Sequence, residues 1–96
     1  MTGREMLRHT LATLAYRGGK AAREAPDRFA DFKTEADIRT PGQILAHVGD
    51  LLDWALDLAD GRHTWHDSPP RPWPEEVARF FEALARLDAR LASEAP

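Results

Sequence analysis

The chain has 96 residues, 13 of them basic and 16 acidic, with a formal net charge of −3 and no cysteine. This length allows one domain, and the lack of cysteine excludes disulfides, thiolate metal sites and cysteine nucleophiles. The basic residues form no single run, so nucleic acid is not an expected partner. The sequence has no signal-peptide pattern and no stretch near the roughly 20 apolar residues of a membrane span, so we expect a cytoplasmic protein without a membrane partner.

The first predicted helix covers residues 3–24, because Thr2 and Glu5 have the spacing of a capping box. Gly18 lies in the middle of its apolar stripe, where a small residue allows another helix to approach closely. The other members of the stripe are Leu7, Leu11, Leu14, Ala15, Ala21 and Ala22. Residues 26–39 are predicted to be a connection, in which Phe29 and Phe32 cap one end of a bundle from a single helical turn.

The second predicted helix begins at the capping box Thr40-Pro41-Gly42-Gln43 and ends near Asp60, before Gly61. Its apolar arc covers roughly 200°, wider than the stripe of about 100° on a helix with one covered face. We therefore expect it to contact more than one neighbour. The arc consists of Ile44, Leu45, Val48, Leu51, Leu52, Ala55, Leu56, Leu58 and Ala59.

Four aspartates of this helix fall on the arc opposite the apolar residues: Asp50, Asp53, Asp57 and Asp60. A calcium site requires a loop of converging oxygens, which a helix face does not provide. The spacing therefore predicts a solvated strip.

Residues 62–73 are rich in proline and aromatic residues and are predicted to form a stiff loop. The third helix is predicted to begin at Pro74, with Glu75 and Glu76 near the positive end of its dipole. Its buried stripe consists of Val77, Phe80, Phe81, Leu84, Leu87 and Leu91. No strand-like alternation is present. The sequence thus predicts an all-α, up-down helical bundle that looks one helix short, and its exposed apolar faces predict a homodimer.

His47 is the strongest candidate for chemistry, because it lies on the flank of the apolar arc of the second helix. There an imidazole either binds a metal in the bundle interior or is a core-edge residue bonded to a carbonyl or to water. His63 and His66 form a His-x-x-His, which is either a weak metal-binding spacing or two exposed loop histidines. His9 is expected to be solvated and away from His47.

Asp88 falls on the buried stripe of the third helix. It is either the partner of a buried arginine or histidine, or it lies beyond the point where packing stops. The three tryptophans, Trp54, Trp65 and Trp73, are interpreted as core and lid residues. The sequence contains no Gly-rich phosphate loop, Ser-His-Asp spacing or paired-carboxylate motif, so no catalytic residue is predicted.

The segment Arg39-Thr40-Pro41 followed by Ile44-Leu45-Ala46-His47-Val48-Gly49-Asp50-Leu51 resembles the DinB-like superfamily of bacterial four-helix bundles. The resemblance implies a divalent metal, nickel or zinc, held by three histidines, with His47 as the first ligand. The other two come from a His-x-x-x-His pair that has no counterpart here, since no histidine follows His66. Residues 1–96 are then a single, incomplete helical domain that lacks the fourth helix, and this chain is not expected to bind the metal tightly.

Two functions follow from these observations. The resemblance implies a metal-dependent protein of the hydrolase or thiol-transferase class, with a small-molecule substrate. The alternative is a non-enzymatic helical-bundle interaction module that homodimerises through its exposed apolar faces.

Overall fold

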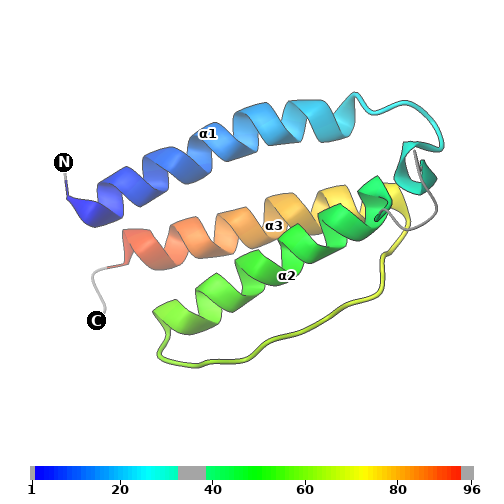
Figure 1. Ribbon diagram of the computed structural model, residues 1–96. Coiled ribbons are helices and arrows are strands. Elements are labelled where there is room, and N and C mark those ends of the chain that lie inside the picture. Colours follow the sequence, from blue (N-terminus) through cyan, green and yellow to red (C-terminus); the bar gives the residue numbers. More distant parts are fainter. Residues whose placement is uncertain (1, 33–38, 94–96) are drawn as a thin grey trace.

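The protein, described here by a computed structural model over residues 2–32 and 39–93, contains three long α-helices and one short 3₁₀ turn (Figure 1). Helix α1 spans Gly3–Arg23, η1 Phe29–Asp31, α2 Pro41–Ala59 and α3 Trp73–Ala92. No strand occurs in this described part of the chain. The predicted all-α bundle is confirmed, and the predicted helix ends differ from the observed ones by a residue.

Local sequence explains where α1 and α2 begin. The Thr2 hydroxyl accepts a hydrogen bond from Glu5 N–H, and the Glu5 side chain accepts one from Thr2 N–H. Thr40 and Gln43 form the same reciprocal pair at the start of α2. Each pair satisfies two backbone donors that a helix N-terminus otherwise leaves open.

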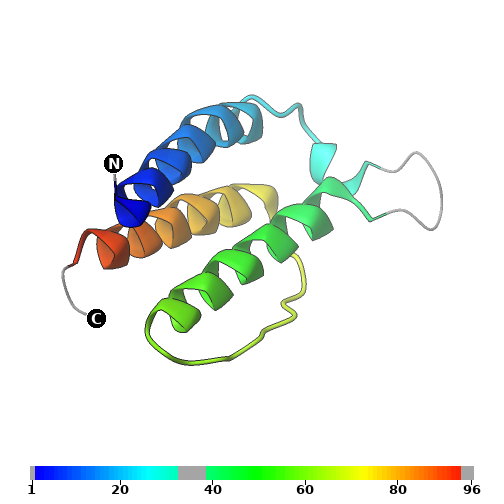
Figure 2. The ribbon, with the colours of Figure 1, turned by 60° about the vertical axis from the view of Figure 1, so that its left-hand side comes forward.

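Helix α3 is the centre of the fold, with α1 and α2 packed on either side of it (Figures 1 and 2). The buried apolar core comes from α2 and α3 and consists of Leu52, Phe80, Ala83, Leu84 and Leu87. Helix α1 adds the half-buried Leu11 and Ala15 to it. Because α3 separates the other two helices, one long face of α1 and one of α2 have no helix beside them.

Helices α2 and α3 are parallel, and α1 is antiparallel to both (Figure 1). Asp50 and Asp60 of α2 pair with Arg79 and Arg90 of α3 in the same order. Residues 61–72, here called the strap, run back along the bundle to make this possible. Extended chain covers about 3.3 Å per residue, more than twice the rise of a helix, so the strap can span the 19 residues of α2. The helix directions are therefore up, down, down rather than the predicted alternation.

Helices α1 and α3 approach most closely at a glycine. A Cβ on Gly19 would lie 2.2 Å from Cζ of Phe81, whereas one on Gly18 would lie 3.4 Å from the Phe80 ring. The close approach that the sequence predicts at Gly18 thus occurs one residue later, where Gly19 is fully buried.

We expect Gly19→Ala to lower the free energy of unfolding by about 1–3 kcal/mol, because the added methyl group must displace the Phe81 ring. Gly18→Ala is the matched control. It has room for the methyl group and should be neutral, or more stable by up to about 1 kcal/mol through helix propensity. Urea denaturation of the two variants and the wild type measures the difference. Equal effects of the two substitutions would contradict the packing.

Candidate functional site

Helix α2 has an apolar stripe whose exposed members lie on the face that α3 leaves uncovered, while Val48 and Ala55 pack partly against the core. The stripe consists of Ile44, Val48, Leu51, Ala55 and Leu58, at the alternating spacing of four and three residues that is typical of helix–helix seams. Three of these side chains are exposed: Ile44 by 49%, Leu51 by 39% and Leu58 by 44%. We call this set the α2 stripe.

An apolar groove of about 550 Å³ lies between the second half of α1 and the first half of α2. The α2 stripe enters this groove at Ile44 and Val48, and the facing wall comes from Gly18, Ala21 and Ala22. Trp73 lies at its end, where its indole N–H donates to the Ala22 carbonyl at 2.9 Å. Its ring also packs edge-on against Phe29, with centroids 5.5 Å apart. Phe29 is still 37% exposed and Phe32 is 58% exposed, so the cap that the sequence predicts from both residues forms only in part, at Phe29.

The prediction of a solvated aspartate strip on α2 is wrong at Asp50, whereas the other three aspartates keep part of their exposure. Asp50 is 1% exposed, and all four aspartates pair with arginines. The reason is that this face of α2 packs against α3 and the start of the strap, which carry the arginines. The pairs are Asp50 and Asp53 with Arg79, Asp57 with Arg62, and Asp60 with Arg62 and Arg90.

The centre of this surface is a buried group formed by Asp50, Glu76 and Arg79. One Arg79 nitrogen donates to Asp50 at 2.6 Å and to Asp53 at 3.0 Å, and the other donates to the Ala46 carbonyl at 3.2 Å. Glu76 is also 1% exposed and lies 3.6 Å from Arg79. A Cβ on Gly49 would meet this guanidinium at 2.8 Å, so glycine is what allows Arg79 to lie against α2.

The same buried acids hold the strap in place. Ser68 donates to the two carboxylate oxygens of Asp50 through its N–H and its hydroxyl, both at 2.8 Å. Further along, the Arg71 N–H donates to Glu76 at 3.1 Å. From the sequence, Glu76 is expected only to interact with the dipole of α3, and neither Arg79 nor Ser68 is predicted to be part of a site. The similar spacing of Asp50 and Asp60 on α2 and of Arg79 and Arg90 on α3 is a signal that points to Arg79, whereas no spacing in the sequence points to Ser68.

Burial alone would raise the pKa of Asp50. Hydrogen bonds from Arg79 and Ser68, together with the charge of Arg79, outweigh the burial and hold this pKa below its ordinary value. Burial likewise disfavours the charge on Arg79, but the bonds to Asp50 and Asp53 raise its pKa above the usual range. Both groups therefore stay charged in the folded protein.

His47 is half-buried on α2 beneath the strap, and its ring packs edge-on against Trp65 with the two ring centroids 5.7 Å apart. It lines a polar cavity of about 170 Å³, here called the strap cavity. The other residues that line the cavity are Arg39, Gln43, Asp50, Asp67, Ser68 and Pro70. The structure thus places His47 at the edge of the bundle, between the α2 stripe and the strap.

The remaining histidines lie apart from His47. His63 and Trp65 both pack edge-on against Trp54, which lies outside the hydrophobic core, so Trp65 covers Trp54 but Trp54 is not the core residue that the sequence predicts. His66 is exposed on the strap, and His9 is exposed on α1, as predicted. Within residues 2–32 and 39–93 no three His, Asp or Glu side chains come together as a metal-binding group. None of the helices described is long and apolar enough to cross a membrane.

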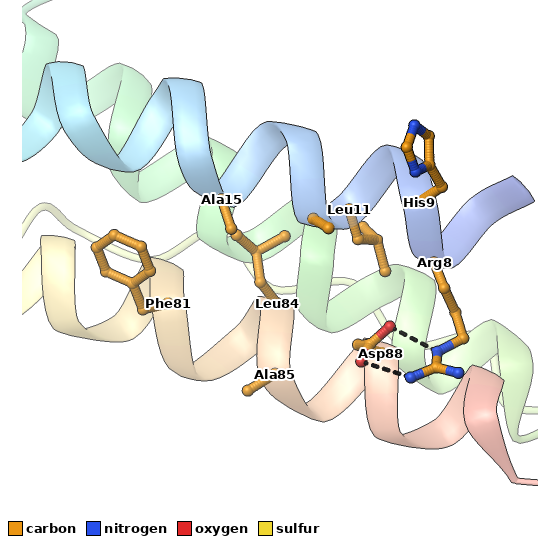
Figure 3. Close-up of a pocket in the computed structure, with 9 residues that line it drawn as sticks. Arg8, His9, Leu11, Ala15, Phe81, Leu84, Ala85 and Asp88 are labelled. Carbon is orange, nitrogen blue, oxygen red and sulfur yellow. Dashed lines mark hydrogen bonds and ion pairs between the residues drawn. The ribbon is translucent and has the colours of Figure 1, made fainter. Parts of the chain in front are cut away.

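Asp88 lies at one end of an apolar groove between α1 and α3 (Figure 3). Its carboxylate accepts from Nε of Arg8 at 2.9 Å, and this bond raises the pKa of Arg8 above its ordinary value. The pair is largely exposed. Asp88 is therefore an arginine partner, as one of the two sequence interpretations has it, but the arginine is at the surface.

No known protein family, curated protein or solved structure matches this chain. The resemblance to the DinB-like superfamily, and His47 as a metal ligand, therefore stay predictions.

The Asp50 pKa predicts how stability depends on pH. Because the folded state lowers this pKa, its stabilising effect is complete above the ordinary aspartate value near 4 and is lost as pH falls below it. We expect Asp50→Asn to cost about 3 kcal/mol at pH 7, since it removes one partner of a buried ion pair. The variant should also lose less stability than the wild type between pH 5 and 2, roughly the range in which aspartates titrate.

Denaturant unfolding at a series of pH values measures both effects. Asp27→Asn, at an exposed residue of the first connection, is the control and should follow the wild type. An Asp50→Asn variant as stable as the wild type at pH 7 would contradict the role assigned to the pair.

Proposed function

We propose that this chain is a helical-bundle interaction module that forms a two-fold homodimer through the α2 stripe. The exposed heptad spacing of Ile44, Leu51 and Leu58 carries the proposal, because a stripe of this kind on a helix surface suits a second helix. Isologous pairing would bring the same stripe from both copies together.

The size of the exposed surface supports the proposal. The accessible surface is 6773 Å², against about 5,500 Å² expected for a folded monomer of 10.8 kDa. The radius of gyration is 14.6 Å, against about 12.5 Å for a compact domain of this length. The surplus, about 1,300 Å², is larger than the roughly 800 Å² that each partner buries in a standard interface, so it is enough to supply one.

The charges on α2 favour a second copy of the same helix. Its acids lie on the face that pairs with arginines of its own chain, so two α2 stripes can meet without opposing carboxylates. Leu51 is midway between Ile44 and Leu58. An antiparallel pair of α2 helices would therefore place Leu51 near the two-fold axis and set each Ile44 against a Leu58 of the other copy.

We expect sedimentation equilibrium to show a dimer at protein concentrations of about tens of micromolar, because an interface of this size supports an affinity in that range. Leu51→Glu should raise the dissociation constant at least roughly 100-fold, because it removes two buried leucines and opposes two charges near the axis. Tyr16→Glu is the matched control, since Tyr16 is 72% exposed on α1 outside the stripe and the groove. Circular dichroism confirms that both variants fold. A monomeric wild type, or equal loss of dimer in both variants, would refute the proposal.

A second candidate is the metal-dependent DinB-like protein implied by the sequence. The position of His47 favours it, because the ring lies beside the α2 stripe, where a further helix would bring ligands within reach. A zinc site with catalytic function takes about three protein ligands. In this candidate His47 is one, and a helix on the stripe supplies the others.

For the 96-residue chain we expect weak or no binding of zinc or nickel, since His47 lacks histidine partners within it. Calorimetric titration of the wild type and His47→Ala tests this, with His66→Ala as the control because His66 is exposed on the strap. Binding that is tight and lost only in His47→Ala would show that the dimer already completes a site. Equal loss in both variants would point to surface histidines and against this candidate.

A further inference from the structure

The strap cavity has a wall that is fixed without any ligand. Both carboxylate oxygens of Asp50 accept hydrogen bonds from Ser68, and Oδ1 also accepts one from Arg79. Removing one partner of a buried ion pair is strongly destabilising, so this group is a fixed part of the fold. Its effect here is to keep Asp67, Ser68 and Pro70 of the strap against the first turns of α2, as the lining of the cavity shows.

Two side chains of opposite charge line the cavity: Arg39 and Asp67. Neither has an ion-pair partner within the part of the chain that the structure describes. A guanidinium presents a fork of donors that matches a carboxylate, and a carboxylate accepts from an ammonium group. Gln43 uses its side-chain oxygen on Thr40 N–H, so the group it can offer a ligand is its NH₂ donor.

The size of the cavity limits the ligand. Its 170 Å³ would hold about six waters at roughly 30 Å³ each. Drug-sized ligands occupy pockets of roughly 300 Å³ or more, so this one suits a molecule of a few atoms.

We propose that the strap cavity binds a small zwitterion, an α-amino acid of the size of alanine. The carboxylate lies on Arg39 and the Gln43 NH₂, and the ammonium group lies on Asp67. This goes beyond the proposed dimer and depends neither on it nor on a metal. His47 lines the same cavity and contacts Trp65, so occupancy changes the surroundings of an indole ring.

Titration of the ¹⁵N-labelled protein with L-alanine tests the proposal. We expect saturable shifts of the His47 and Ser68 amides and the Trp65 indole, with a dissociation constant in the millimolar range. Acetate and ethylamine each carry one of the two charges and should bind at least tenfold more weakly. Arg39→Gln and Asp67→Asn should each weaken L-alanine binding at least tenfold.

Arg17→Gln and Asp27→Asn make the same chemical changes at exposed positions outside the cavity and should bind L-alanine like the wild type. Shifts that do not saturate, acetate or ethylamine binding as tightly as L-alanine, or equal losses in the control variants would overturn the proposal. Sedimentation of the same samples separates this outcome from failure of the dimer, because the two sites share no residue.

Discussion

The ion pair between Asp50 and Arg79 is the interaction on which the rest of the fold depends. It joins α2 to α3, and through Ser68 it joins both helices to the strap. A charged group at this depth is costly unless every partner is present. Here both carboxylate oxygens of Asp50 have donors, and the guanidinium also binds Asp53 and the Ala46 carbonyl. The same group therefore contributes both to the register of the two parallel helices, with the Asp60–Arg90 pair, and to the path of the connection, with the Arg71–Glu76 hydrogen bond.

This arrangement divides α2 into two faces with different roles. The face that carries the aspartates pairs with α3 and the strap, and the apolar core between α2 and α3 lies next to it. The opposite face carries the exposed α2 stripe. A bundle of antiparallel neighbours joined by short loops would leave less of α2 uncovered. Because the strap returns along one side and α1 packs mainly on α3, Ile44, Leu51 and Leu58 of the stripe are left exposed.

Helix positions and capping boxes could be predicted from the sequence, because each depends on residues close together in the chain or on one helix. The close glycine contact is predicted at Gly18 but occurs at Gly19. The burial of Asp50 and the ion pairs of the α2 aspartates could not be predicted in this way. A helical wheel sorts the residues of one helix into polar and apolar faces and contains no information on the neighbouring helix. Acidic residues are therefore expected to face solvent unless the facing helix is known to carry the opposite charge. Arg79 and Arg90 carry that charge, but only a parallel α3 brings them to Asp50 and Asp60 in the right order. That direction depends on the length of the strap, which the periodicity of the helices does not report.

The position of His47 follows from the same geometry. On the helical wheel it lies between the polar and apolar faces of α2, and in the structure that boundary is where the strap crosses. A residue there can meet a ligand held by the strap on one side and a helix packed on the stripe on the other. The buried ion pair fixes the strap on one side of His47. What lies on the other side depends on which helix covers the α2 stripe. Ligand binding in the strap cavity and metal binding beside the stripe thus use different sides of α2. A substitution of Asp67 affects the first, and a substitution of Leu51 affects the second.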